Sequence, residues 1–282
     1  MLLRSRMLQS APRGQIRPMG ETMPDVTLVT YLIVCPLVFL GGFVDSIAGG
    51  GGLITLPAYY IAGLNPSLAG GTNKLSAMSG TAVATSAYAR RGLVDWKKGL
   101  ASLLGSMPGS ALGAWLLTML PELYVRAGLV LALPFVALLV LRNKDLSQRA
   151  ALVPAQWTLP ASLMIGLLVG VYDGLVGPGT GTFLILMYVM LLGEEALKAS
   201  GTAKLINLGS NLGALGVLMA TGHVLYTLAL PAAAFGIAGN TLGANLAIRK
   251  GAPFIRALLL AVLALLLLKL VIDLLPEIAR IR

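Results

Sequence analysis

Two lysines of this 282-residue chain stand inside apolar stretches, and each follows a threonine at the same spacing. Thr72 precedes Lys74 in the run Gly-Thr-Asn-Lys-Leu, and Thr202 precedes Lys204 in the run Gly-Thr-Ala-Lys-Leu. A lysine within a membrane costs about 3 kcal/mol unless it is paired or solvated, so such a position indicates function. An ammonium group beside a hydroxyl offers positive potential and hydrogen-bond donors, which suit an oxyanion. We therefore expect both lysines to face the protein interior and to bind an anion together with the threonines.

Glycine-rich loops follow two aspartates, Asp45 and Asp173, and each loop leads into a short apolar segment. Consecutive glycines let backbone amides converge, and the N-terminus of the helix that follows carries partial positive charge. The pattern predicts a helix that breaks in the membrane just after each aspartate and an anion site at the break. The loop residues assigned to this site are Gly49, Gly50, Gly51, Gly52, Gly177, Gly179 and Thr180.

The two aspartates admit a second interpretation of the lysines. Lys74 could neutralise Asp45, and Lys204 could neutralise Asp173, which would hold the helix bundle together without binding substrate. Asn73 and Asn207 lie on the same segments as the lysines and could supply neutral donors to a ligand, although helix–helix hydrogen bonding explains them equally well. Other glycines, such as Gly105, Gly109 and Gly113, are interpreted as sites of close helix packing.

The motifs belong to an internal repeat. Val94 and Val224, Gly109 and Gly239, and Arg126 and Arg256 are all separated by 130 residues, as are the two lysines. Upstream the spacing falls to 128 residues, which places an insertion near Glu194. We predict a basic N-terminal tail over 1–24, a first membrane repeat over 25–145 and a second over 146–282.

Composition identifies an all-α polytopic membrane protein, because 57% of the residues are apolar and only 11% are charged. Regular alternation of polar and apolar residues is absent, which disfavours a β-barrel. About eight spans are expected, over 26–46, 71–90, 98–120, 122–141, 156–175, 202–221, 226–248 and 254–275. The remaining segments, 53–64 and 182–193, reach only about 18 Å as helices, against about 30 Å of hydrocarbon. We predict that both are half-helices or re-entrant segments.

The formal net charge of +10 comes from basic clusters that flank the apolar segments, which indicates membrane topology rather than nucleic-acid binding. If the short segments do not cross, the tail, both middle clusters and the C-terminus share the cytoplasmic side. If they do cross, the two halves are inverted and the N-terminus lies outside. The first arrangement is preferred here because it places more basic residues inside, so a cytoplasmic N-terminus is expected.

The motifs in order resemble the TauE/SafE, or sulfite exporter, family over nearly all of 25–275. The resemblance rests on the run from Gly42 to Pro57, on both lysine motifs and on the Gly-Leu-Val-Asp-Trp loop at 92–96. It implies a carrier of the bacterial inner membrane with two four-span repeats that moves sulfur-containing anions such as sulfite, thiosulfate or sulfonates. The second half departs from the first, with Pro178 in place of Gly50 and Ala203 in place of Asn73.

A secondary carrier or exporter of small anions, such as sulfite, thiosulfate or sulfoacetate, fits these features best. An anion channel would fit the same fold. A membrane enzyme fits worst, because one histidine, one cysteine and no carboxylate cluster offer neither a metal site nor an activated nucleophile. The expected partners are a small anionic substrate and the lipid bilayer, with no cofactor, metal or nucleic acid.

Overall fold

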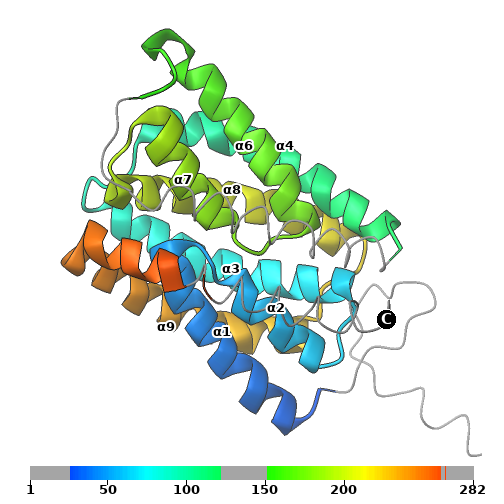
Figure 1. Cartoon of the computed structure of the whole chain (residues 1–282). Helices are drawn as coiled ribbons and strands as arrows, with labels where there is room; N and C mark the ends of the chain where they lie inside the picture. Colours follow the sequence, from blue (N-terminus) through cyan, green and yellow to red (C-terminus); the bar gives the residue numbers. More distant parts are fainter. Residues whose placement is uncertain (1–25, 122–150, 262–263, 265–282) are drawn as a thin grey trace, which may run out of the picture.

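The computed structural model describes residues 26–121, 151–261 and 264, and every regular element in this part of the chain is helical (Figure 1). The first half contains α1 (Leu28–Ala48), α2 (Gly52–Ile61), α3 (Pro66–Ala89) and α4 (Trp96–Met119). The second half contains the 3₁₀ turn η1 (Ala155–Trp157), α6 (Thr158–Leu175), α7 (Thr180–Leu192), α8 (Ala196–Ala220) and α9 (Tyr226–Lys250). A short apolar helix, Ala252–Ala261, follows α9.

Length and composition qualify five of the described helices to cross a membrane: α1, α4, α6 with its preceding turn, α8 and α9. This finding confirms the prediction of an all-α polytopic membrane protein. The helix α3 is as long as α4 but less apolar. The predicted span 122–141 and most of the span 254–275 lie outside the described residues.

Local sequence sets the helix boundaries. Thr27 caps α1 in a capping box, Asn65 caps α3 with Pro66 in its first turn, and Asp95 accepts the backbone N–H of Lys98 at the start of α4. These caps satisfy amides that have no partner within the helix.

Small residues let the helix backbones approach closely. A Cβ added at Gly105, Gly109 or Gly113 of α4 would lie 2.2 to 2.4 Å from a carbonyl oxygen of α6. On the other side of the molecule, Gly239 and Gly243 of α9 make the same kind of contact with α1. The packing interpretation of the glycines on α4 is therefore confirmed.

The order of these contacts gives the helix directions. Gly105, Gly109 and Gly113 meet successively later residues of α6, so α4 and α6 are parallel, and the contacts of α9 with α1 run in the same order. Gly209 and Gly213 of α8 likewise meet Leu103 and Met107 of α4 in order, which makes α8 parallel to α4.

The central helices α3 and α8 run in opposite directions. Gly71 near the start of α3 meets the carbonyl of His223, which follows α8, whereas Gly201 near the start of α8 meets the carbonyl of Leu93, which follows α3. Gly71 and Gly80 of α3 meet His223 and Gly236 in order, so α3 is parallel to α9. The helices α1, α3 and α9 thus run one way, and α4, α6 and α8 run the other way.

Equivalent helices of the two halves therefore have opposite directions, which corrects the arrangement preferred from the sequence. Because α1 and α3 are parallel, the chain between them must return through the segment that contains α2. The arrangement preferred from the sequence was wrong because the choice depended on the number of basic residues on each side, which does not report helix direction.

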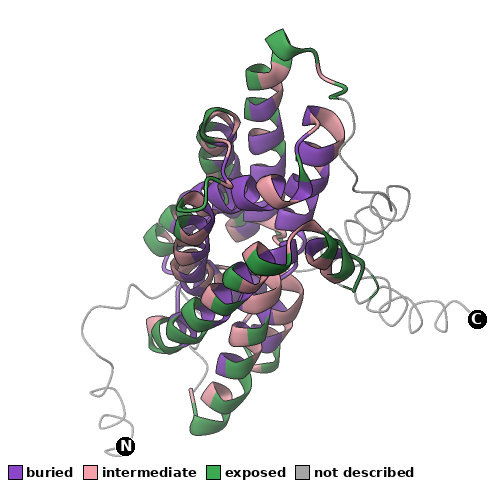
Figure 2. Ribbon diagram, turned by 90° about the vertical axis from the view of Figure 1, so that its left-hand side faces the viewer, coloured by how far each residue is buried: buried purple, intermediate pink, exposed green. Residues whose placement is uncertain are grey.

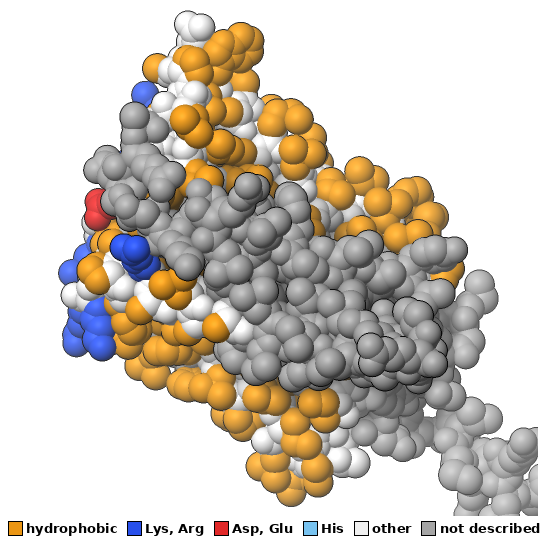
Figure 3. Space-filling view, viewed as in Figure 1, with side chains coloured by type: hydrophobic (Ala, Val, Ile, Leu, Met, Phe, Trp, Pro, Cys, Tyr) orange, Lys and Arg blue, Asp and Glu red, His pale blue; other side chains and the backbone are white. Residues whose placement is uncertain are grey.

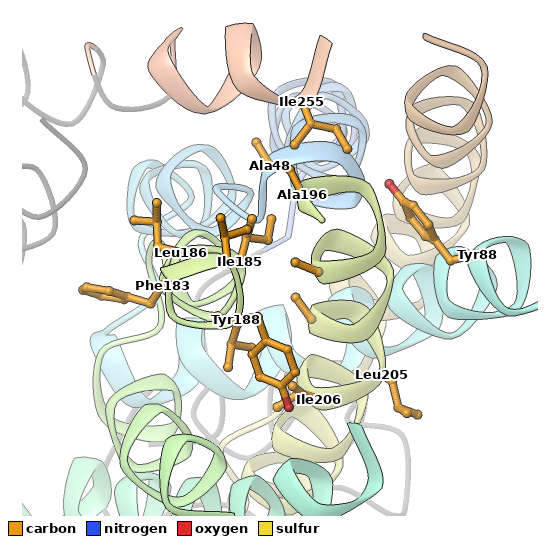
Figure 4. Packing of buried hydrophobic residues seen from close by; sticks show 14 of the residues in the cluster. Ala48, Tyr88, Phe183, Ile185, Leu186, Tyr188, Ala196, Leu205, Ile206 and Ile255 are labelled. Carbon is orange, nitrogen blue, oxygen red and sulfur yellow. The ribbon is translucent and has the colours of Figure 1, made fainter. Parts of the chain in front are cut away.

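The two short helices are not equally exposed. Most residues of α7 are buried, and Ile185, Leu186 and Tyr188 form a core with Ala196 and Ile206 of α8 (Figures 2 and 4). A half-helix can stay at membrane depth where protein surrounds it, and α7 meets that requirement.

Candidate functional site

Both helix breaks predicted from the sequence are present. The helix α1 ends at Ala48, three residues after Asp45, and α6 ends at Leu175, two residues after Asp173. The backbone turns through Gly49, Gly177 and Gly179, with φ of 76°, 89° and 83°, a conformation that favours glycine. The glycines are therefore needed to reverse the chain between each helix and the half-helix that follows.

The two breaks touch each other. A Cβ added at Gly49 would lie 2.2 Å from the carbonyl carbon of Gly181, and a Cβ at Gly52 would lie 3.3 Å from Cα of Pro178. The hydroxyl of Thr182 donates to the carbonyl oxygen of Ala48 at 2.7 Å. The N-termini of α2 and α7 therefore converge on one place, although the two half-helices come from different halves of the chain.

Each of the two buried lysines pairs with the aspartate of the other half. Lys74 Nζ lies 2.5 Å from Asp173 Oδ2, and Lys204 Nζ lies 2.9 Å from Asp45 Oδ2 and also donates to the Asp45 carbonyl. The hypothesis that Lys74 neutralises Asp45 and Lys204 neutralises Asp173 is therefore wrong. The partners are exchanged because the inverted packing brings each lysine to the break of the opposite half.

Both lysines face the interior, as predicted, since Lys74 is 6% exposed and Lys204 is fully buried. The carboxylate of Asp173 also accepts hydrogen bonds from Ser210 Oγ at 2.5 Å and from Thr180 Oγ1 at 2.8 Å. A buried carboxylate with this many donors is well compensated in its ionised form.

A cavity of about 80 Å³ opens beside the two breaks, between α1, α2, α3 and the break after α6. At roughly 10–15 Å³ for each enclosed water, it has room for several waters or a small anion. The predicted site residues that line it are Asp45, Gly49, Gly51, Gly52, Asn73, Lys74, Asp173, Gly177, Thr180 and Asn207. The predicted residues outside the lining are Gly50, Thr72, Gly179, Thr202 and Lys204.

The hydroxyls of Thr72 and Thr202 have partners other than the cavity. Thr72 Oγ1 accepts the backbone N–H of Leu225 at 3.1 Å, and Thr202 Oγ1 accepts the backbone N–H of Asp95 at 3.0 Å. Both threonines are fully buried. They fasten the residues that precede α9 and α4 to the central helices, which differs from the donor role expected from the sequence.

Several lining residues were not selected from the sequence. Thr81 lies two helical turns beyond Lys74, so the helical period could have found it. Thr55 and Tyr60 on α2 lack such a signal. Asn240 reaches the cavity from α9, and its Nδ2 donates to the carbonyl of Gly236. Only the tertiary packing places α9 at this site.

The cavity is built mainly from the first half because side-chain size differs between the halves. Thr55 and Ser76 line the cavity, whereas the residues at the same repeat positions in the second half, Phe183 and Ile206, are large, apolar and buried. The corresponding space in the second half is thus filled by side chains.

Full and partial charges of both signs meet at the site. The two lysines and two aspartates sum to zero, since each lysine pairs with one aspartate. The C-termini of α1 and α6 carry the opposite partial charge, and the last carbonyls of α1 already accept hydrogen bonds from Lys204, Tyr88, Ser200 and Thr182. The N-termini of α2 and α7 each add about half a positive elementary charge. Converging helix N-termini suit an anionic group.

Broken helices that meet at a polar cavity within an apolar helical bundle define a membrane transport protein. The profile of the family described as sulfite exporter TauE/SafE matches residues 34–270. The chain belongs to this family, as its motifs indicated, and it is a membrane transporter rather than an enzyme.

Three relatives are each described as a probable membrane transporter protein. ORF9 of a Sinorhizobium species is 41% identical over 249 residues, which cover 87% of this chain and 93% of the relative. YfcA of Escherichia coli K12 is 36% identical over 265 residues, which cover 90% of this chain and 95% of the relative. The relative from Haemophilus influenzae is 34% identical over 258 residues, which cover 88% of this chain and 97% of the relative. No solved structure matches the chain.

Proposed function

We propose that this transporter is a secondary carrier of small sulfur-containing oxyanions or organosulfonates, such as sulfite, thiosulfate or sulfoacetate. The observation that carries the proposal is the convergence of the N-termini of α2 and α7 on a cavity beside two lysine–aspartate ion pairs. An anion that enters the cavity meets the N-termini of both half-helices and the ammonium group of Lys74.

The proposed orientation follows from the basic residues. The helices α3 and α9 end on the same side of the molecule. Arg90 and Arg91 follow α3, and Arg249 and Lys250 lie in the last turn of α9. Figure 3 shows basic side chains gathered on this side. We call it the basic end. Under the positive-inside rule the basic end faces the cytoplasm of a bacterial inner membrane. The start of α1 then lies on the outer side, which replaces the cytoplasmic N-terminus expected from the sequence.

Ligand-dependent stabilisation of the purified protein tests the substrate class. A bound anion at 100 times its Kd adds about 2.7 kcal/mol of apparent stability, which is a measurable rise in Tm. Sulfite, thiosulfate and sulfoacetate should raise Tm, whereas choline and neutral amino acids should not. An equal shift with choline would contradict an anion site.

Two variants of α3 locate the effect. Asn73→Ala removes a side chain that lines the cavity and installs the residue found at the equivalent position in the second half. It should reduce the shift caused by the anion. Ser79→Ala is the matched control, because Ser79 is not among the lining residues and donates to the Leu75 carbonyl of its own helix. Saturable counterflow in proteoliposomes would distinguish a carrier from an anion channel.

A further inference from the structure

A cluster of charged side chains lies at the basic end, outside the central cavity. Lys98 Nζ lies 2.8 Å from Glu194 Oε1 and 3.4 Å from Asp95 Oδ2, and Lys198 Nζ lies 3.6 Å from Asp95 Oδ2. We call these four residues the ionic cluster. It joins the start of α4 to the connection between α7 and α8 and to the first turn of α8.

Glu194 is the most enclosed member of the cluster. Its side chain is 4% exposed, and its Oε2 atom is buried without a hydrogen-bond partner. The charged or titratable groups that face it are Lys98 and Asp95 from α4 and Tyr188 from α7, with Lys198 of α8 reaching it through Asp95. A buried carboxylate held chiefly by one ammonium group depends strongly on that group.

The opposite end of the molecule has leucines at the same repeat positions. Leu225, Leu228 and Leu68 stand 130 residues from Asp95, Lys98 and Lys198, and Leu64 precedes the cap of α3 as Glu194 precedes the cap of α8. All four leucines are at most 4% exposed and belong to one apolar cluster. The two ends are thus closed by the same backbone arrangement with different chemistry.

A single helix connects the ionic cluster to the cavity. The helix α7 begins at Thr180, which lines the cavity, and ends at Leu192, two residues before Glu194 (Figure 1). Its 13 residues span about 20 Å. A displacement of the connection between α7 and α8 would therefore move the cavity wall directly.

Moving the helices apart has different consequences for solvation at the leucine end and at the basic end. Opening the leucine end exposes apolar side chains to water, which is unfavourable. Opening the basic end hydrates the buried carboxylate of Glu194, which offsets the loss of its ion pair. We propose that the ionic cluster is the latch of a gate at the basic end, and that the ion pair between Lys98 and Glu194 keeps this gate closed. The proposal depends on the transporter class and not on the identity of the substrate.

The test measures access to the cavity from each end. A cysteine replaces Ala77, which lines the cavity, in a chain whose single Cys35 is changed to Ser. Membrane vesicles of both orientations are treated with a membrane-impermeant thiol reagent. A separate Arg91→Cys protein identifies the orientation that exposes the basic end.

Lys98→Met leaves Glu194 as a buried, unpaired carboxylate and should accelerate labelling from the basic end by about tenfold. Lys97→Met is the matched control, because Lys97 is an exposed neighbour on the same helix turn, and its rate should stay within about twofold of the parent. The double variant Lys98→Met with Glu194→Gln buries no unpaired charge and should return to the parent rate. Labelling from the leucine end should not change in any of them.

Equal rates for Lys98→Met and Lys97→Met would overturn the proposal, as would a double variant that labels as fast as Lys98→Met. Faster labelling from the leucine end would overturn it too. If Lys98→Met does not fold, the double variant still must fold, because it removes both charges. Recovery of folded, closed protein by Glu194→Gln then supports the latch, and failure of the double variant to fold overturns it.

Discussion

Replacing Lys74 by Met tests the exchange of ion partners between the two halves. Met preserves most of the length of the side chain and removes the charge. The change leaves Asp173 without its ammonium partner in an environment where both side chains are at most 8% exposed.

The magnitude follows from the remaining contacts. Breaking a buried pair by removing one partner costs about 3–5 kcal/mol. Asp173 retains the hydroxyl donors Ser210 and Thr180, and hydrogen bonds to a charged group contribute about 1.5–3 kcal/mol each. We therefore expect Lys74→Met to lower the unfolding free energy by about 3 kcal/mol, the lower limit of this range. The double variant Lys74→Met with Asp173→Asn should lie within about 1 kcal/mol of the parent, because the amide oxygen can accept one hydroxyl and the amide nitrogen can donate to the other.

The control pairs Lys74→Met with Asp45→Asn, which leaves Asp173 and Lys204 both unpaired. The losses of unfolding free energy from the two single changes should add to about 6 kcal/mol, since Lys74 and Asp45 are not partners. Denaturant titration of the detergent-solubilised proteins gives the free energies of unfolding for a double-mutant cycle. A larger coupling energy between Lys74 and Asp45 than between Lys74 and Asp173 would refute the exchanged pairing.

Three further predictions concern single positions. Burial raises the pKa of Glu194, and Lys98→Met removes the ammonium group that opposes this shift. The closed gate of that variant is therefore most stable below the ordinary glutamate pKa, where Glu194 is neutral, and it loses this stability as pH rises through the raised pKa. The measurement is the rate of cavity labelling from the basic end in Lys98→Met, divided by the rate in the double variant with Glu194→Gln. This ratio should rise with pH, and a ratio that does not change would contradict the prediction. Gly49→Ala should abolish stable folding, because its Cβ would lie 2.2 Å from the backbone of Gly181 at φ 76°; recovery of normally folded protein after solubilisation would contradict that geometry. Thr202→Val should lower the unfolding free energy by about 1–3 kcal/mol, since the partly buried amide of Asp95 loses its acceptor, and an unchanged value would show that another group replaces that acceptor.

The sequence predicted the elements whose physics is local. Apolar runs of sufficient length fixed the helices, and the glycines after Asp45 and Asp173 fixed the breaks, because positive φ and close backbone approach leave few other choices. The burial of Lys74 and Lys204 followed from the cost of exposing them to lipid.

The partners of those residues could not be predicted in the same way. Repeat spacing shows that Lys74 and Lys204 are equivalent, but it does not show which half supplies each aspartate. The pairing depends on helix direction, and the loops that determine direction carry basic residues whose distribution favoured another arrangement. The place of Thr72 and Thr202 outside the cavity lining could not be predicted either, because a hydroxyl near a lysine can bond a ligand or a distant backbone amide equally well.

The exchange of ion partners has a consequence for what either half could do alone. Either half, made as a separate protein, would bury a lysine and an aspartate that its own fold does not pair, so two copies would have to assemble. The opposite directions of equivalent helices further require that those two copies insert into the membrane in opposite orientations. A protein made of one such repeat would therefore have to assemble as a dual-topology dimer to pair its buried charges.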